Sequence, residues 1–247
     1  MDPLAPLMEL SEVADALENA RATVERMLWH KSLEDDADDI AAEVALADTA
    51  ATLRLEGYDL DTDSLRAWDG EDAVVRGAIR VTEALPGLVD VWKSSPRYVL
   101  ARLHMFATSD FEVSQGSPQP GRPDLDAAGS ARMDALCALV SNPTSDLPPA
   151  LRAAVIHGEL LSLHPFPLSN DIVARAAAKL TLAAQGMDPR FLIALNAGHL
   201  EREPEYVGSA KSFNTGTPDG VRSWLKHFGM ALETGAGQTL KICNETE

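Results

Sequence analysis

Three kinds of side chain that could handle a phosphate-containing substrate lie close together between His164 and Arg175. An imidazole can take a proton from a hydroxyl at neutral pH, because its unperturbed pKa lies near neutrality. Ser169 and Asn170 stand where a helix would begin, and the unpaired N–H groups of a first helical turn attract anions. The stretch therefore predicts a base beside an anion-binding turn, with Arg175 one turn further along to reach a phosphate or a carboxylate.

Two helices joined by a short polar turn must position these groups. Apolar residues recur at three- and four-residue steps over 151–163, and Pro165 ends that helix because proline disfavours helical backbone in the residue before it. The second helix begins with Ser169 or Asn170 as its N-cap and stops at Gly186, a usual helix terminator. A histidine that only caps its own helix is the structural alternative for this pattern.

The stretch from His164 to Arg175 resembles the signature of Fic (Fido) domains, His-Pro-Phe-x-(acid)-Gly-Asn-Gly-Arg-x-x-Arg, and aligns with it without a gap. Fic proteins move AMP, or less often another phosphate-containing group, from a nucleotide to a protein hydroxyl. The resemblance covers roughly residues 95 to 233. It implies a catalytic base at His164, phosphate binding by Ser169, Asn170 and Arg175, and structural roles for Pro165 and Phe166.

Four positions depart from that signature. Leu168 replaces the acid that would be a magnesium ligand, Ser169 and Asp171 replace two glycines, and Ile172 replaces the first arginine. Asp171 adds a negative charge where glycine would let the backbone approach the phosphates, and two unit charges about 4 Å apart repel by roughly 4 kcal/mol at an effective dielectric of 20. We therefore expect poor Mg-ATP binding and no metal ligand in the motif.

A second resemblance lies upstream. The apolar stripe over 40–55 predicts a helix that ends at Gly57, with Thr52 and Glu56 four residues apart near its C-terminus. Thr-x-x-x-Glu-Gly resembles the inhibitory helix of Fic proteins that regulate themselves from the N-terminal side. In those proteins the glutamate pairs with the second arginine and takes the place of the nucleotide's terminal phosphate. The resemblance implies a contact between Glu56 and Arg175, and an ordinary surface glutamate is the alternative.

Composition and charge limit the remaining classes. The 247 residues are 45% apolar and 24% charged, which is ordinary for a soluble globular protein. The net charge of −17 argues against a protein that binds nucleic-acid phosphates. Cys137 and Cys243 lie far apart and are expected to be reduced thiols rather than zinc ligands. No leader or membrane-length apolar run is recognised, so a cytoplasmic protein without a membrane partner is expected.

The expected fold is an all-α, Fic/Fido-type helical bundle with at most a short flap hairpin over 111–125, a region rich in proline and glycine. The expected organisation is an N-terminal helical extension over 1–90, a Fic-like core over 91–234 and a flexible tail over 235–247. Helical spacing predicts further helices over 10–32, 62–84, 96–107, 191–200, 203–212 and from 217 onward.

Two functions of different class follow from these patterns. The first is an altered transferase that uses His164 with a less charged nucleotide or another phosphate donor. The second is a pseudoenzyme that keeps the Glu56–Arg175 contact as structure and binds another protein. A nucleotide, without a firm requirement for Mg²⁺, is the one cofactor that the resemblance implies. The expected partner is a target protein or a binding protein, and the sequence leaves open whether the chain forms a homodimer.

Overall fold

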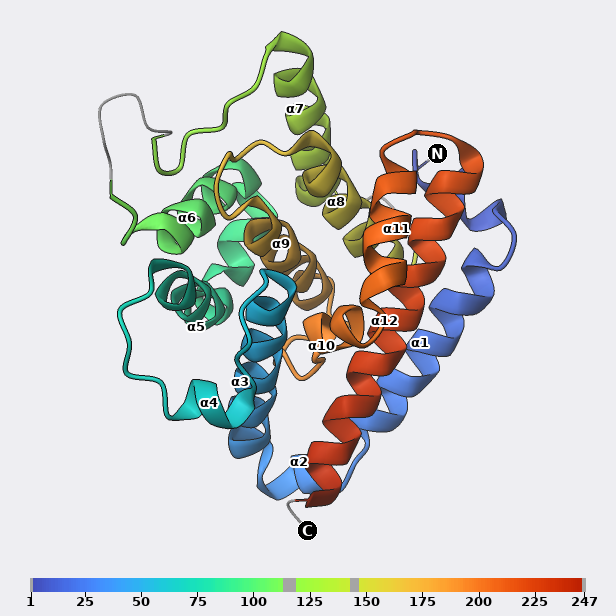
Figure 1. Ribbon diagram of the computed structural model, residues 1–247. Helices are drawn as coiled ribbons and strands as arrows, with labels where there is room; N and C mark the ends of the chain where they lie inside the picture. The colour runs from blue at the N-terminus through green and yellow to red at the C-terminus, as the bar shows by residue number, and fades with distance from the viewer. Residues whose placement is uncertain (1, 113–118, 143–146, 246–247) are drawn as a thin grey trace.

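The computed structural model describes residues 2–112, 119–142 and 147–245, and within these ranges it contains helices and turns but no strand (Figure 1). The expected all-α class is therefore confirmed. Of the expected flap, residues 113–118 lie outside the described residues, and the described parts on either side are turns and loop. The helices are η1 (Ala5–Glu9), α1 (Val13–Leu28), α2 (Ser32–Asp35), α3 (Ala37–Leu55), α4 (Thr62–Arg66), α5 (Ala73–Ser94), α6 (Pro96–Thr108), α7 (Ala127–Ser141), α8 (Pro149–Leu163), α9 (Asn170–Ala184), α10 (Leu195–Glu201), α11 (Glu203–Phe213) and α12 (Pro218–Glu245).

Helix α9 lies at the centre of the bundle (Figure 1). It packs against α5, α6 and α8, and almost all of its residues are buried. Alanines at 174, 176, 177 and 178 leave room for these neighbours to approach closely, because each adds only one methyl group. The motif turn between α8 and α9 is therefore held by the most buried pair of helices in the chain.

A second layer is built on the long helix α12. Helices α1, α10 and α11 pack along it, and α1 lies at the outer edge of the molecule (Figure 1). Helices α10 and α12 cross at glycines: a Cβ atom added to Gly198 would lie 1.9 Å from the carbonyl oxygen of Ala231, and one added to Gly235 would lie 2.5 Å from that of Ala194. The two backbones therefore touch, and only glycine fits at these positions.

Two predicted boundaries are wrong. The helix expected over 62–84 is divided into α4 and α5, because Asp72 caps a new helix by accepting hydrogen bonds from the N–H groups of Val74 and Val75. The flexible tail expected over 235–247 instead continues α12 to Glu245, with Ala236 and Cys243 buried on its inner face. Helix α7 was not anticipated by the apolar spacing.

No disulfide joins Cys137, which is half-buried, to Cys243, which is buried. None of the helices in the described ranges has the length and apolar character that a membrane span requires.

Candidate functional site

His164 ends α8 in a left-handed conformation, with φ of 46° and ψ of 56°. This backbone closes the helix because the N–H of His164 still donates to the carbonyl of Leu160, at 3.0 Å, while Pro165 prevents a further helical turn. The imidazole is exposed beside a pocket of about 300 Å³. The predicted base therefore stands at a helix end with room for a substrate next to it.

The pocket beside His164 has mixed chemistry. It combines apolar side chains with hydroxyl, carboxylate, amide and ammonium groups, which suits a small organic molecule with several polar substituents. One wall is fixed by Ser162, whose Oγ donates to Oδ1 of Asn214 at 2.5 Å and accepts from Nη2 of Arg132 at 3.1 Å. The lining residues are Leu161, Ser162, His164, Asp171, Tyr206, Val207, Ala210, Lys211 and Asn214.

Asn170 is buried and braces the motif turn. Its Oδ1 accepts from the N–H of Phe166 at 3.4 Å, and its Nδ2 donates to the carbonyl of Leu160 at 3.2 Å and to Oδ1 of Asp171 at 3.3 Å. The side-chain amide is thus committed to the chain itself, which leaves only the backbone N–H of this residue for a phosphate.

Ser169 is the N-cap of α9, as expected, but it adopts a left-handed conformation with φ of 52°. Its side chain forms no capping hydrogen bond with the described residues. A non-glycine residue in this region is strained by about 1–2 kcal/mol, so the geometry of the turn favours the glycine that the Fic signature has here.

The flap side of the motif is anchored by Pro165 and Phe166. The N–H of Asp124 donates to the carbonyl of Pro165 at 2.9 Å, and the buried ring of Phe166 stacks on His104 with 4.4 Å between ring centroids. His104 in turn accepts a hydrogen bond from the N–H of Gly121 at 2.8 Å, and burial lowers the pKa of its imidazole. Sequence patterns did not single out His104, since an isolated histidine in an apolar helix carries no signal.

Glu56 and Arg175 form the ion pair that the resemblance implied. Oε1 of Glu56 lies 2.5 Å from Nη2 of Arg175, with 22% and 2% of their side chains exposed. Burial works to lower the pKa of Arg175, but the surrounding Tyr206, Glu56 and Asp171 outweigh it and raise that pKa. The guanidinium is therefore charged, and the carboxylate of Glu56 already neutralises it.

A second polar row holds α3 in place beside that ion pair. Asp48 forms a buried ion pair with Lys179 of α9, and the two side chains are 2% and 4% exposed. Oδ1 of Asp48 also accepts from the N–H of Asn196 at 2.6 Å, and its Oδ2 accepts from Nδ2 of Asn196 at 3.0 Å. Nδ2 of Asn196 reaches Oγ1 of Thr52 at 2.8 Å. Helix α3 is thereby joined to α9 and α10 through buried charges.

Sequence reasoning missed Asp48, Lys179 and Asn196, although a signal for the first two exists. Asp48 precedes Thr52 by four residues, and Lys179 follows Arg175 by four, so each extends the polar face of its helix by one turn. Two such rows facing each other predict a second ion pair. Asn196 gives no comparable signal, because it reaches α3 only through the tertiary fold.

The positions that depart from the signature do not supply the missing groups. Leu168 is exposed, and Ile172 is buried in the apolar cluster that α5, α6 and α9 share. Asp171 lines the pocket and leaves its charge where a phosphate would approach. In the parts of the chain that are described, no three His, Cys, Asp or Glu side chains are grouped to hold a metal ion. The residues of the motif therefore do not fit the magnesium ion of an ordinary Fic site.

Behind the motif lies a buried group of aromatic and imidazole rings. Nε2 of His157 lies 3.1 Å from the hydroxyl of Tyr206, and Nδ1 of His199 lies 3.0 Å from Nε2 of His227. Burial lowers the pKa values of all three imidazoles, to about 4 for His227, and raises the pKa of Tyr206 to about 12. His157 is thus a neutral core residue rather than a second base.

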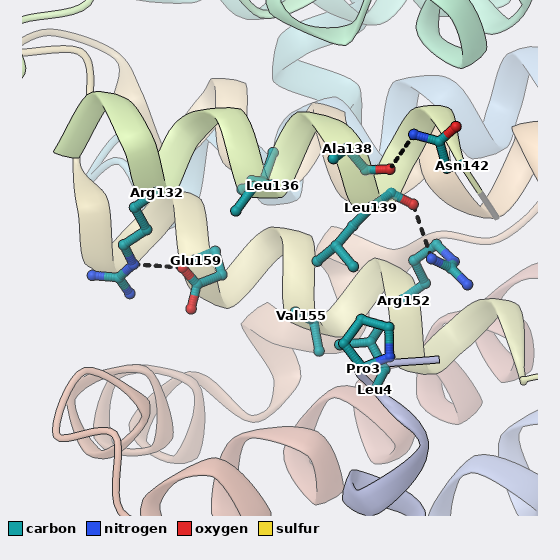
Figure 2. A pocket seen from close by; sticks show the side chains of 11 residues that line it. Pro3, Leu4, Arg132, Leu136, Ala138, Leu139, Asn142, Arg152, Val155 and Glu159 are labelled. Carbon is teal, nitrogen blue, oxygen red and sulfur yellow. Dashed lines mark hydrogen bonds and ion pairs between the residues drawn. The ribbon is translucent and has the colours of Figure 1, made fainter. Parts of the chain in front are cut away.

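A cavity larger than the pocket beside His164 lies elsewhere in the described chain. It has a volume of about 580 Å³ and lies between α7, α8 and the N-terminal segment, with Arg132 and Glu159 paired on its rim (Figure 2). Arg152, on the same cavity, forms an ion pair with Asp2 at 3.1 Å. No motif residue lines this cavity, so cavity size does not locate the site.

A helix-end histidine, a tight turn and a buried arginine that meets an N-terminal glutamate thus lie together in an all-α bundle. The bundle has the fold of Fic (Fido) proteins. Solved structures with this fold resemble the chain over most of its length. A Fic family protein from Desulfovibrio desulfuricans G20 superposes with a TM-score of 0.70 at 16% identity, covering 92% of this chain and 74% of that one. A fragment of Fic-1 from C. elegans gives 0.73 at 17% identity, covering 98% and 76%. At this identity the likeness shows the fold.

Sequence comparisons add nothing to this result. No family model matches the chain. No curated protein matches it by sequence either.

Proposed function

We propose that this chain is a Fic-type nucleotidyltransferase with an altered site, held closed by its own α3, and that its transfer of AMP or another phosphate-containing group is weak. The observation that carries this proposal is the Glu56–Arg175 ion pair, in which the one remaining motif arginine is occupied by a carboxylate. A terminal phosphate needs that arginine, so a ligand must either displace Glu56 or do without the contact.

His164 supports a transferase because it can act as a base at the mouth of the pocket. It would take the proton of a hydroxyl on a target protein while the hydroxyl oxygen attacks the α-phosphorus of the nucleotide. The bond from that phosphorus to the bridging oxygen breaks, and with ATP the leaving group is pyrophosphate. The pocket of about 300 Å³, lined by Tyr206 and Asn214, would hold the nucleoside part.

The charges around the turn favour a donor with fewer negative charges than ATP. Asp171 faces the pocket, Arg175 is neutralised by Glu56, and no first arginine or metal ligand among the described residues offsets a triphosphate. A nucleotide whose diphosphate is esterified on both sides, such as CDP-choline, carries less charge and should therefore bind better than ATP.

A pseudoenzyme that binds another protein is the second candidate, and the buried ion pair of Asp48 with Lys179 favours it. Moving α3 away would expose that pair and separate Glu56 from Arg175 at once. Under this second proposal the closed state is permanent and the Fic fold serves as a scaffold.

The test measures binding of ATP, GTP, UTP and CDP-choline, with and without Mg²⁺, together with label transfer from α-labelled nucleotides. We expect little transfer from ATP by the wild type or by Glu56→Gly. Transfer that His164→Ala abolishes establishes the transferase, whereas absence of nucleotide binding and of transfer in both proteins supports the scaffold.

A repaired variant distinguishes a site that has lost the groups of the Fic signature from an intact site that Glu56 blocks. Leu168→Glu, Ser169→Gly and Asp171→Gly in a Glu56→Gly background restore the acid and both glycines, and we expect this variant to gain activity that requires His164. Ile172→Arg is left out, because Ile172 is buried among apolar side chains and a charge there would destabilise the fold. If the repaired protein binds nucleotide yet transfers nothing, the role given to His164 is wrong.

A further inference from the structure

Trp29 is the most exposed large apolar side chain of the described chain, with 88% of its surface accessible. It follows directly on α1, at a corner that is tied down: Nε2 of His30 lies 3.2 Å from Oδ1 of Asn244, and Oγ of Ser32 donates to the carbonyl of Cys243 at 3.2 Å. Two other tryptophans, Trp92 and Trp224, are fully buried. A tryptophan presented by a fixed corner is the kind of residue that anchors protein interfaces.

A groove of about 470 Å³ runs along the same helix. Its apolar lining comes from Leu17, Val24 and Leu28 of α1, together with Pro148 at the start of α8 and Met187 after α9. One element therefore carries both a projecting ring and an apolar groove that could receive such a ring.

The charges of α1 are self-complementary. When two copies of α1 run antiparallel so that Trp29 of each lies level with Leu17 of the other, Glu25 of each lies level with Arg21 of the other. These two side chains are of opposite sign, and the pair occurs twice between the two helices. A shift by one residue along the helix would lose this match.

We propose that two copies of this chain associate through α1 in that antiparallel register, about a twofold axis, with Trp29 of each copy in the groove of the other. A twofold interface requires one surface to carry both complementary parts, and α1 does so in shape and in charge. Helix α1 lies at the edge of the molecule with α12 packed along its inner side, which leaves its outer face open (Figure 1).

Forming this dimer does not require the loss of ion pairs that contribute much to the stability of the single chain. In the single chain Arg21 already pairs with Glu18 and Glu25, but all three side chains are more than half exposed. Exposed pairs of this kind contribute little, so exchanging them for pairs across the interface costs little. An interface built mainly on one helix from each copy is small, and we therefore expect a dissociation constant in the micromolar range.

The test uses sedimentation velocity on the full chain across a micromolar concentration series. We expect a monomer–dimer equilibrium for the wild type and a monomer for Trp29→Ala. The matched control is Tyr98→Ala, which removes an exposed aromatic ring from α6 and should leave the equilibrium unchanged. A wild type that stays monomeric throughout, or a dimer that survives Trp29→Ala, overturns the proposal.

The register has its own test. Arg21→Glu alone and Glu25→Arg alone each place like charges opposite each other in a homodimer, so each protein should be monomeric. In a mixture of the two variants, the glutamate introduced in one faces the arginine introduced in the other, and a one-to-one heterodimer should form. Circular dichroism confirms that both variants are folded, which is expected because positions 21 and 25 are exposed. A mixture that stays monomeric while the wild type dimerises refutes this register.

Discussion

Replacing one member of the buried pair between Asp48 and Lys179 should be far more costly on one side than on the other. In Asp48→Asn the side chain of Lys179, only 4% exposed, loses the carboxylate with which it forms an ion pair. Stranding a buried charge costs about 3–5 kcal/mol. Since a domain is typically stable by about 5–15 kcal/mol, this one change should remove a large share of the total.

The reverse change is milder, because Asp48 keeps other donors. In Lys179→Met the carboxylate still accepts from the N–H and Nδ2 of Asn196 and from the N–H of Ala197, and methionine fills much of the volume of lysine. Losing one of several hydrogen bonds to a charged group costs about 1–3 kcal/mol. The double variant should be more stable than the sum of the two single effects predicts, by about 1–3 kcal/mol.

Urea unfolding followed by circular dichroism measures these differences. Arg66→Met serves as the control, because its partner Glu43 and Arg66 itself are 43% and 52% exposed, and an exposed pair contributes at most about 1 kcal/mol. The reasoning is refuted if Asp48→Asn costs no more than Arg66→Met, or if Lys179→Met costs more than Asp48→Asn. Amide hydrogen exchange should also show weaker protection of α3 in Asp48→Asn, since the helix loses a buried ion pair with α9.

Three further outcomes are expected. Glu56→Ala should lower the free energy of unfolding by about 2–3 kcal/mol in urea titrations, because it leaves Arg175 buried and unpaired, while the partial exposure of Glu56 limits the effect. The folded-state pKa of His227 lies near 4, so the unfolded chain binds a proton that the folded chain excludes between that pH and about 6.5. Stability should fall as the pH falls through this window, by about 1.4 kcal/mol per pH unit for this histidine, and His227→Gln should reduce the slope of the urea midpoint against pH. At the left-handed Ser169, Ser169→Gly should be at least as stable as the wild type, and Ser169→Val should be less stable by about 1–2 kcal/mol. A Ser169→Val protein as stable as the wild type would show that the turn is not strained.

Local patterns in the sequence predicted the parts of the site that lie on single helices. His164 is placed by Pro165, which stops a helix, and Glu56 by the apolar stripe that ends at Gly57. The positions of His164 and Glu56 within their own helices follow from helical geometry. The partnership of Glu56 with Arg175 came from the family resemblance, because nothing in either helix alone specifies a contact across more than a hundred residues.

Features that depend on tertiary packing escaped prediction. Asn170 reads as a phosphate ligand in the motif, yet its amide is used by Phe166 and Leu160 once the turn is closed. Residues 235–245 read as a tail, because their apolar residues are few, but one face of this segment is buried against the rest of the fold, through Gly235, Ala236, Thr239 and Cys243. The break before α5 was visible as a capping aspartate at position 72 and was overridden by apolar spacing.

Substitutions at the glycine crossing of α10 and α12 would alter the site formed by the motif and α3 without changing any residue of that site. Asn196 lies two residues before Gly198 and donates two hydrogen bonds to Asp48. A methyl group at Gly198 would collide with the backbone of Ala231 and push α10, with Asn196, away from α3. Relatives in which Gly198 or Gly235 has been replaced should therefore hold α3 less firmly, so substitutions outside the motif can change the accessibility of the motif arginine.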